Sequence, residues 1–335
     1  MNKELNPEKL NGSLISINQQ TGDVLALVGG VDYQKSKFNR VTQAIRSVGS
    51  AIKPFIYQIA LNLGYNPATK IPDISRTFKI PGDTPQEDEI WKPKNYEKNT
   101  LGLITLREAL VHSRNLATIN LAMQIGLDKI IKGLQYFGFE KVPPNLSIVL
   151  GSIGLSPWKL AEKYTIFSNY GLKTKLRLVK KLFIPKENIS IEFEEKHDEI
   201  EPDYQAYLIT NILEDVVKKG TGRNARVNGI EIAGKTGTAN RYVDAWFCGY
   251  TPNTQTIIWF GNDDSTTLGK GMSGGRVSAP VFRYFYKRYL KLHPELVRKF
   301  HIPKEIKSFE INGFKELFTP LSPPPTQSTT EIPVF

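Results

Sequence analysis

The stretch GIEIAGKTGT, residues 229–238, decides between two unrelated folds. In one interpretation it is a phosphate-binding loop, because the pattern G-x-x-x-x-G-K-[ST] is matched letter for letter by Gly229, Gly234, Lys235 and Thr236. In the other interpretation it is a β-strand whose Lys-Thr-Gly-Thr end lines a cleft. The two interpretations require different neighbours along the chain, so the surrounding sequence can choose between them.

The local pattern favours the strand. Ile230 and Ile232 alternate with the polar Glu231, which is the period of two expected of a β-strand. A phosphate loop instead needs a flexible glycine-rich turn and a helix that begins at its lysine. Here the residues between the two glycines are Ile-Glu-Ile-Ala, and a β-rich segment follows Thr238. A nucleotide-hydrolysing protein is therefore disfavoured.

Other predicted strands lie on both sides of this one along the chain. Two apolar segments follow it, 244–251 and 254–263, and they are joined by the turn residues Pro252-Asn253. Near the start of the chain, SLISINQQTGDVLALVGG (13–30) alternates about a Thr-Gly-Asp turn and predicts a β-hairpin. Residues 173–202 are strand-like with a charged excursion.

A buried helix is predicted over SAIKPFIYQIALNLG (50–64). Its apolar residues recur at spacings of three and four, which places them on one helix face. Ser50 begins this helix, and Pro54 falls in the first turn, where a missing N–H costs little. Gly64 ends it.

Further helices follow along the chain. Thr-Leu-Arg-Glu at 105–108 is a capping box that begins a helix ending near His112, and a second helix follows Asn115. Residues 156–171 and 203–220 are also helical, whereas 65–104 contain five prolines and look irregular. The order of strand pair, helices and three strands indicates an α+β fold in which distant parts of the chain share one sheet.

The composition limits the possible classes of protein. The 335 residues are 40% hydrophobic and carry a net charge of +11, enough for one large domain or two small ones with a real core. Basic residues are spread out and no nucleic-acid-binding signature appears, so no nucleic acid partner is expected. The single cysteine, Cys248, is expected in the core, and the four histidines lack metal-ligand spacing. Neither a signal peptide nor a run of about 18 apolar residues is present in this sequence.

Ser50 and Lys53 form an S-x-x-K tetrad at the start of the buried helix. Because residues i and i+3 share a helix face, the Lys53 amine can reach the Ser50 hydroxyl. Apolar surroundings favour the neutral amine, which can accept a proton. Taken alone, the tetrad is better explained by a helix cap and an exposed lysine.

Two more short motifs change that balance. Ser113 and Asn115 form S-x-N at a break between helices, where side chains can point into a cleft, although two helix caps would explain them equally. In the third motif, Lys235-Thr236-Gly237, the glycine removes a side chain where a ligand must lie against a strand. Together and in this order, S-x-x-K, S-x-N and K-T-G are the signature of penicillin-binding proteins and related β-lactamases.

Over roughly residues 13–285 the chain resembles the transpeptidase domain of class A penicillin-binding proteins. The resemblance is carried by RSVGSAIKPFIYQIAL, WKPKNYEKNTLGLITLREALVHSRN, GSIGLSPWKLAEKY, GTGRNA and AGKTGTANRYVDAWFCGYTP. Ser-Val replaces the usual Gln-Pro before Gly49, and Ala239 stands where Thr is frequent, but neither is a reacting group. The implied fold is a five-stranded antiparallel sheet flanked by helices, with a helical subdomain and the active site between them.

The resemblance also implies a role for each motif residue. Ser50 would attack the penultimate carbonyl of a D-Ala-D-Ala stem peptide and form an acyl-enzyme, with Lys53 as general base. Ser113 and Lys235 would relay the proton to the leaving amine. The oxyanion hole would consist of the backbone N–H groups of Ser50 and Thr238. The residues that would hold the substrate are Asn115, Thr236, Gly237 and Thr238. No metal or organic cofactor is implied.

The implied organisation has three parts. Residues 1–12 would lead in from an upstream region, 13–290 would form the transpeptidase domain, and 291–335 would be an extension. The Pro/Ser/Thr-rich end of this extension predicts disorder from about residue 320. Family members carry a membrane anchor and a glycosyltransferase domain before this region, so the expected location is the outer, periplasmic face of the cytoplasmic membrane. The expected partners are peptidoglycan stem peptides and β-lactams.

Three alternatives share the same signature. A D-Ala-D-Ala carboxypeptidase would use water as the acceptor of the acyl group. A β-lactamase would hydrolyse its acyl-enzyme rapidly with a second base, and Glu162, which lies in the right interval, is expected within the 156–171 helix instead. A non-catalytic penicillin-sensing or scaffold module would bind without turnover.

Overall fold

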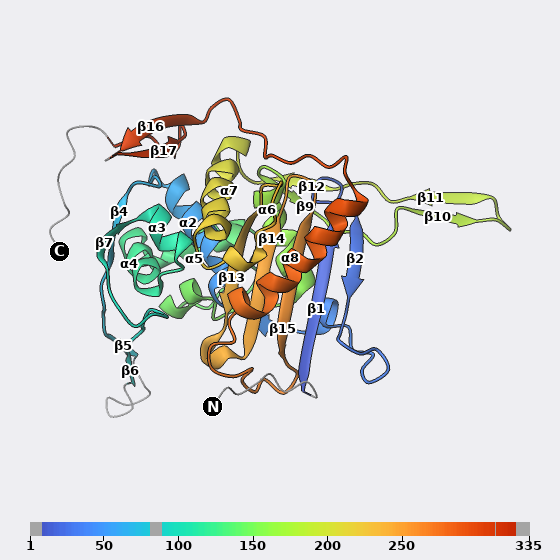
Figure 1. Ribbon diagram of the computed structural model, residues 1–335, viewed down its shortest axis with the longest axis horizontal. Coiled ribbons are helices and arrows are strands. Elements are labelled where there is room, and N and C mark those ends of the chain that lie inside the picture. The colour runs from blue at the N-terminus through green and yellow to red at the C-terminus, as the bar shows by residue number, and fades with distance from the viewer. Residues whose placement is uncertain (1–8, 81–88, 312, 326–335) are drawn as a thin grey trace.

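A five-stranded antiparallel sheet forms the centre of the molecule (Figure 1). The computed structural model describes residues 9–80, 89–311 and 313–325. The sheet has the order β13-β14-β15-β1-β2, with β1 (Leu10–Ile17), β2 (Val24–Val28), β13 (Ala233–Thr238), β14 (Asp244–Tyr250) and β15 (Gln255–Asn262). All neighbouring strands are antiparallel, which confirms the predicted α+β sheet and its pairing of distant segments.

Two strand boundaries differ from the prediction. β1 begins at Leu10, so residues 10–12 of the predicted lead-in already belong to the sheet. β13 begins at Ala233, and the alternating residues 230–232 lie in a loop instead. The backbone N–H of Glu231 donates to the carbonyl of Arg298 over 2.9 Å, and its carboxylate accepts from the N–H of Phe300 over 2.7 Å. The alternation was misleading because a distant loop, not a strand, pairs with this segment.

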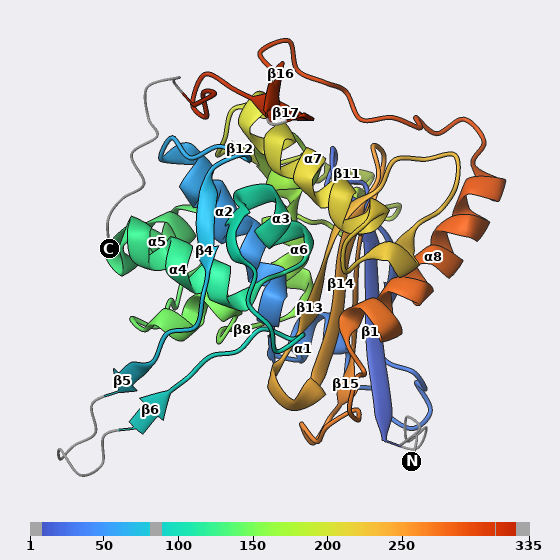
Figure 2. The same ribbon diagram turned by 60° about the vertical axis from the view of Figure 1, so that its left-hand side comes forward.

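Helices cover both faces of the sheet (Figure 2). On one face α8 (Gly274–Leu292) packs on β14 and β15, where Phe247, Ile258 and Phe282 are buried together. On the other face Trp246 and Trp259 join the main core, which includes α2 (Lys53–Asn62) and α6 (Pro157–Ser168). Successive side chains of a strand point to opposite faces, so each central strand contributes to both cores.

The predicted buried helix is present, but it begins differently. A 3₁₀ turn, η1 (Gly49–Ile52), precedes α2, and every residue from Lys53 to Leu61 is buried. Ser50 lies inside this turn and makes no capping hydrogen bond, so the predicted Ser50 cap is wrong. Pro54 lies in the first turn of α2, where its missing N–H leaves no helical hydrogen bond unmade.

The predicted helix break at Ser113 is confirmed. α3 (Leu106–Val111) begins with the capping box of Thr105 and Glu108, and α4 (Asn115–Ile125) follows the break. α6 begins at the predicted Ser156 cap, whose side chain accepts from Lys159 N–H. α5 (Leu127–Tyr136) and α7 (Asp203–Lys218) complete the helical layer beside α2.

Short elements connect these layers. Residues 65–104, predicted to be irregular, contain β4 (Lys70–Asp73), β5 (Phe78–Ile80), β6 (Glu89–Trp91) and β7 (Gly102–Thr105), with β4 paired to β7 and β5 to β6. The 173–202 strands are β9 (Leu172–Thr174), β10 (Lys181–Ile184), β11 (Ile189–Glu192) and β12 (His197–Glu199). The remaining short elements are α1 (Arg40–Gln43), β3 (Arg46–Ser47), η2 (Leu146–Leu150), β8 (Gly154–Leu155), η3 (Arg223–Ala225) and η4 (Asn240–Tyr242).

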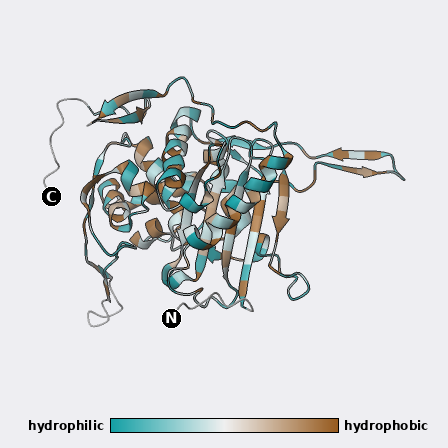
Figure 3. Ribbon diagram, in the orientation of Figure 1, coloured by the Kyte–Doolittle hydropathy of each residue, from teal (hydrophilic) through white to brown (hydrophobic). Residues whose placement is uncertain are grey.

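The β10–β11 hairpin projects from the body and carries apolar side chains (Figures 1 and 3). Leu182 and Phe183 are both exposed on it. None of the helices within residues 9–80, 89–311 and 313–325 is long and apolar enough to cross a membrane.

The C-terminal segment returns to the body of the protein. β16 (Lys307–Ile311) and β17 (Phe314–Phe318) form a hairpin, after which Ser322 is fully buried. The Ser322 hydroxyl donates to the Leu61 carbonyl over 2.9 Å and accepts from Gln205 Nε2 over 3.0 Å. The predicted disorder is therefore wrong for residues 320–325, and residues 326–335 lie outside the described chain.

Candidate active site

Two lysines and a serine from three separate elements meet beside η1. Lys53 Nζ, at the start of α2, donates to the Ser113 carbonyl and to Asn115 Oδ1, each over 2.7 Å, and lies 3.4 Å from Ser113 Oγ. Lys235 Nζ, from β13, donates to Ser113 Oγ over 2.8 Å. The S-x-x-K, S-x-N and K-T-G motifs therefore converge, with the Ser113 hydroxyl between the two amines.

Ser50 is half-buried in the η1 turn at the edge of this cluster. The expected contact between Lys53 and Ser50 is replaced by the contacts of Lys53 with the S-x-N residues, and among the described residues no hydrogen bond engages the Ser50 hydroxyl. The spacing of Ser50 and Lys53 reports only a shared helix face. Asn115 is 62 positions from Lys53, and its amide oxygen accepts from the amine instead.

Glycines let β13 approach η1 closely. A Cβ at Gly49 would lie 2.5 Å from the Thr238 carbonyl oxygen, and Gly49 itself has a φ of +50°. A Cβ at Gly237 would lie 2.7 Å from the Val48 carbonyl oxygen. These contacts explain why side chains are excluded at both positions. They bring the backbone of Thr238 next to that of the turn that carries Ser50.

The S-x-N turn has an unusual backbone conformation, and a buried ion pair of its middle residue, Arg114, anchors it. Ser113 has a φ of +55°, a left-handed conformation that non-glycine residues rarely adopt. The guanidinium of Arg114 turns away from the cluster and donates to Asp73 Oδ2 over 2.5 and 3.0 Å, and to Asn99 Oδ1 over 2.9 Å. The Arg114 and Asp73 side chains are only 3% and 0% exposed. Sequence reasoning missed this pair, because nothing local connects residues 41 positions apart.

Burial disfavours the charged form of both amines and so lowers their pKa values. Desolvation, followed by the nearby charge of Lys235, holds the pKa of Lys53 well below its usual value. Desolvation also lowers the pKa of Lys235 to about 7. A lysine with a lowered pKa has a substantial neutral fraction near neutral pH, and the neutral amine can accept a proton.

The two threonines of β13 differ in their surroundings. Thr236 is buried and its hydroxyl shares a 2.8 Å hydrogen bond with the Thr221 hydroxyl. Thr238 is half-buried, and its hydroxyl accepts from the N–H of Gly274, the first residue of α8, over 3.2 Å. Thr238 lines an open cavity, and Thr236 is not among the described residues that line it.

That cavity has a volume of about 520 Å³ and brings Gly49, Asn115 and Thr238 together. Its other walls come mainly from residues 91–94, 147–152 and 239–243, none of which was predicted to belong to the site. Lys92 and Lys94 are exposed on the first of these, and no acidic side chain is among the described lining residues. The cavity therefore suits a ligand with a negative charge. The segment WKPK was visible in the sequence, but only the fold shows that it faces Ser50's turn.

The same geometry excludes one alternative and locates the residue on which another depended. Lys235 lies within a strand and not at the start of a helix, so the phosphate-loop interpretation fails. Glu162 lies within α6 as predicted, and its carboxylate accepts from Trp158 Nε1 over 3.1 Å. Glu162 is therefore engaged in a hydrogen bond within its own helix.

Comparison with known proteins agrees with this geometry. The family model described as penicillin binding protein transpeptidase domain matches residues 12–287. The penicillin-binding protein 1A of Aquifex aeolicus is 37% identical over 303 residues, 90% of this chain and 41% of that protein. The one from Neisseria flavescens is 38% identical over 282 residues, 82% of this chain and 35% of that protein. The chain thus spans well under half the length of these relatives.

Solved structures show the same architecture. The crystal structure of penicillin-binding protein 1A from Haemophilus influenzae superposes with a TM-score of 0.83 at 28% identity, covering 95% of this chain and 54% of that one. The PonA1 protein from Mycobacterium tuberculosis, solved in complex with penicillin V, has the same fold, with a TM-score of 0.73 at 23% identity over 96% of this chain and 85% of that one. The chain belongs to the family of penicillin-binding protein transpeptidase domains.

Proposed function

We propose that this protein is a serine D-Ala-D-Ala transpeptidase that cross-links peptidoglycan stem peptides and is acylated by penicillin. The observation that carries the proposal is the hydrogen-bonded cluster of Lys53, Ser113 and Lys235 beside the half-exposed Ser50. A hydroxyl needs a neighbouring base to become a nucleophile at neutral pH, and two amines with lowered pKa values lie within this cluster.

In the first step the Ser50 oxygen attacks the carbonyl carbon of the penultimate D-alanine. Lys53, in its neutral form, accepts the hydroxyl proton as the C–O bond forms. As the C–N bond breaks, the Ser113 hydroxyl gives its proton to the nitrogen of the terminal D-alanine. Ser113 Oγ, which Lys235 Nζ contacts at 2.8 Å, is reprotonated by Lys53, whose Nζ lies 3.4 Å away, so both residues return to their starting protonation state. The products are an ester on Ser50 and a free D-alanine. An amine from a second stem peptide then attacks the ester and restores the Ser50 hydroxyl.

Different residues around the cavity are proposed to bind different groups of the substrate. The N–H groups of Ser50 and Thr238, brought together by Gly49 and Gly237, are proposed to stabilise the oxyanion. Thr236, Thr238 and the charge of Lys235 are proposed to hold the terminal carboxylate, with Gly237 leaving room for the peptide and Asn115 holding its amide. Lys92 and Lys94 on the rim add attraction for this negatively charged end.

The wider setting is part of the same proposal. Residues 13–290 are the catalytic domain, working at the outer face of the cytoplasmic membrane, with peptidoglycan and β-lactams as ligands. An upstream membrane anchor and glycosyltransferase domain are supported by the relatives named penicillin-binding protein 1A, of which this chain spans 41% and 35%.

The first test is labelling with a fluorescent penicillin. We expect wild type and Ser190→Ala, a serine exposed on β11, to be labelled equally, and Ser50→Ala to remain unlabelled. The label should persist for hours because the acyl-enzyme hydrolyses slowly. Rapid loss of the label would indicate a β-lactamase, and a folded wild type that takes no label would indicate a scaffold.

A second measurement identifies the acceptor. The protein is incubated with a D-Ala-D-Ala pentapeptide and an amine-bearing stem peptide, and the products are resolved by mass spectrometry. A transpeptidase yields the cross-linked amide. A product shortened by one alanine, without cross-link, would show that water is the acceptor and that the protein is a carboxypeptidase.

A further inference from the structure

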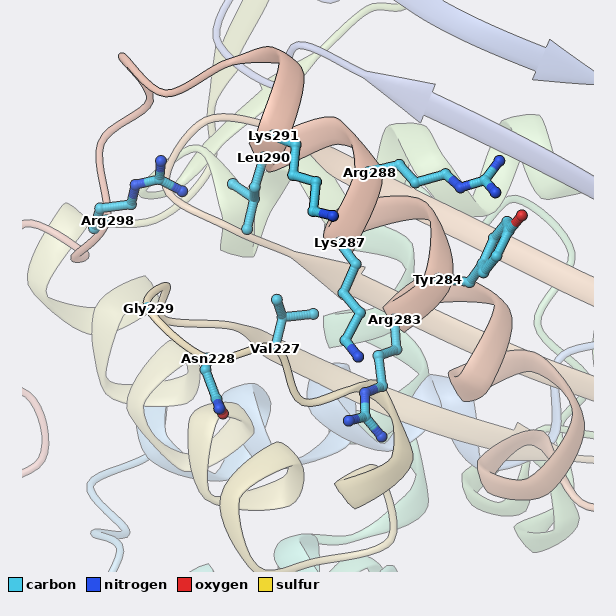
Figure 4. Close-up of a pocket in the computed structure, with 10 residues that line it drawn as sticks. All are labelled: Val227, Asn228, Gly229, Arg283, Tyr284, Lys287, Arg288, Leu290, Lys291 and Arg298. Carbon is cyan, nitrogen blue, oxygen red and sulfur yellow. The ribbon is translucent and has the colours of Figure 1, made fainter.

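A second, cationic cavity lies between α8 and the loop that precedes β13 (Figure 4). Its volume is about 710 Å³, and it shares no lining residue with the cavity beside Ser50. Five of its ten described lining residues are basic and none is acidic. The basic residues are Arg283, Lys287, Arg288, Lys291 and Arg298.

Three of these cations repeat along one side of α8. Arg283, Lys287 and Lys291 are spaced four residues apart, so they lie one above another on the helix surface. Figure 4 shows them on the part of α8 that faces the 227–229 loop, with Arg298 approaching from the opposite wall. The cavity is therefore flanked by positive charge on two sides.

The opposite wall is held in place by backbone contacts. The Arg298 carbonyl accepts from Glu231 N–H over 2.9 Å, and its guanidinium donates to the Pro294 carbonyl over 3.1 Å. The neighbouring Val297 exchanges two hydrogen bonds with the Asn253 side chain, of 2.7 and 3.0 Å. Arg298 is half-buried as a result, and its charge is fixed opposite α8.

Within the described chain no carboxylate forms an ion pair with any of the five cations. The four cations on α8 are exposed, whereas Arg298 is half-buried and still has no carboxylate partner among the described residues, unlike the partly buried Arg46 and Arg107, which pair with Asp244 and Glu316. The acids nearest in sequence are already engaged: Glu231 accepts from Phe300 N–H, and Glu295 pairs with His293 at 3.1 Å. Like charges gathered on one helix face repel one another, and a bound anion removes that cost.

The shape and charge of the cavity together indicate the ligand. We propose that it binds a discrete ligand that carries two or more phosphate groups. Arg288 lies over the Tyr284 ring at 4.3 Å, which leaves four cations, Arg283, Lys287, Lys291 and Arg298, around the cavity. Each terminal phosphate carries about −1.5 to −2 charge near pH 7, so a small oligophosphate can balance these four, whereas carboxylates carry one charge each. Guanidinium groups match phosphate oxygens in pairs. Val227, from the loop, and Leu290, from α8, lie among the cations that line the cavity.

The test uses inorganic tripolyphosphate and isothermal titration calorimetry at low salt. We expect the wild type to bind tripolyphosphate. The affinity of the double variant Lys287→Glu/Lys291→Glu should be lower by a factor of about ten or more, because attraction becomes repulsion at close range. The matched control is Lys129→Glu/Lys132→Glu on α5, which changes the net charge equally at two exposed lysines far along the chain. Its affinity should stay within about threefold of wild type, since distant surface charges are screened.

Three results would overturn the proposal: no binding by the wild type, equal weakening in both double variants, or binding to phosphatidylglycerol vesicles without binding to tripolyphosphate. Labelling by fluorescent penicillin at the wild-type rate reports that each variant is folded, and it keeps this test separate from that of the proposed activity. If the α8 double variant fails to fold, Arg298→Gln removes one cation without reversing charge and should still weaken binding.

Discussion

At the scale of single residues, Ser113 joins two lysines whose charges repel each other. Its carbonyl accepts from Lys53 and its hydroxyl accepts from Lys235. Full protonation of both amines in this buried space is unfavourable, so one proton can be exchanged among them at low cost. The motif residues could be identified from the sequence because they form short patterns. The hydrogen bonds of these residues could not be predicted, because the fold, and not the local sequence, brings Asn115 within reach of Lys53.

The lowered pKa of Lys235 predicts how stability varies with pH. Folding lowers this pKa from 10.5 to about 7, so between these values the unfolded chain binds a proton that the folded protein does not. The free energy of unfolding must therefore rise with pH in this window, by at most about 1.4 kcal/mol per pH unit, and below it the full cost of burying the charge is present.

We expect the wild type to gain stability over Lys235→Met as the pH rises from about 6 to about 9, because methionine has no proton to lose. Urea unfolding at several pH values measures the difference. A difference that stays flat across this range would show that Lys235 remains charged inside the folded protein.

At the scale of secondary structure, the break between α3 and α4 depends on the buried pair of Arg114 and Asp73. The left-handed Ser113 and the first residue of α4 are both adjacent to Arg114, whose guanidinium is anchored at the end of β4. The strand β4, which was not predicted from the sequence, thus positions the S-x-N turn through the contact of Asp73 with Arg114.

Replacing Asp73 with asparagine should destabilise the protein by about 3 kcal/mol, because the buried charge of Arg114 loses its only buried counter-charge among the described residues and keeps only the exposed Glu97 carboxylate at 3.2 Å. The penicillin acylation rate should also fall, since Ser113 and Asn115 lose their anchor. The matched control is Asp198→Asn, which removes the exposed pair with Lys173 and should cost about 0–1 kcal/mol. Equal thermal unfolding temperatures for the two variants would show that the buried pair does not support the turn.

The elements that the sequence predicted well have local signals. The capping box at Thr105, the cap at Ser156 and the left-handed Gly64 just after the end of α2 each depend on a few neighbouring residues, and the strand period at 254–263 is local too. The short strands within 65–104 escaped prediction because each is paired with only one other short strand. Ser50 was assigned as a cap because a 3₁₀ turn and an α-helix have similar apolar spacing over four residues.

At the scale of the whole molecule, the C-terminal segment ties separate helices together. Glu316 accepts two hydrogen bonds from Arg107, and Ser322 connects Leu61 of α2 with Gln205 of α7. Composition alone pointed to disorder here, because three consecutive prolines and nearby serines resemble a flexible tail. Burial of Ser322 depends on partners more than 100 positions away, which no local pattern reports.

A chain that ends at residue 311 should therefore be less stable by about 3 kcal/mol or more, since Arg107 loses a buried partner and several polar groups are left unpaired. Differential scanning calorimetry measures the loss. The single variant Ser322→Ala should give part of it, about 1–3 kcal/mol. Ser308→Ala, at an exposed position of β16, is the control that should change little. An unchanged melting temperature after truncation would contradict this role.

The position of β1 in the sheet means that it is synthesised long before one of the two strands that pair with it. β1 lies between β2 and β15, and Leu10 pairs with Asn262 while Ile17 pairs with Gln255. A ribosome adds about 5–20 residues per second, so β1 waits roughly 12–50 s for its partner to emerge. During that time Ile15 and Ile17, which are fully buried in the finished protein, lack the strand that pairs with them on the β15 side. The first hairpin of this sheet to be synthesised is thus among the last to receive all of its strand partners.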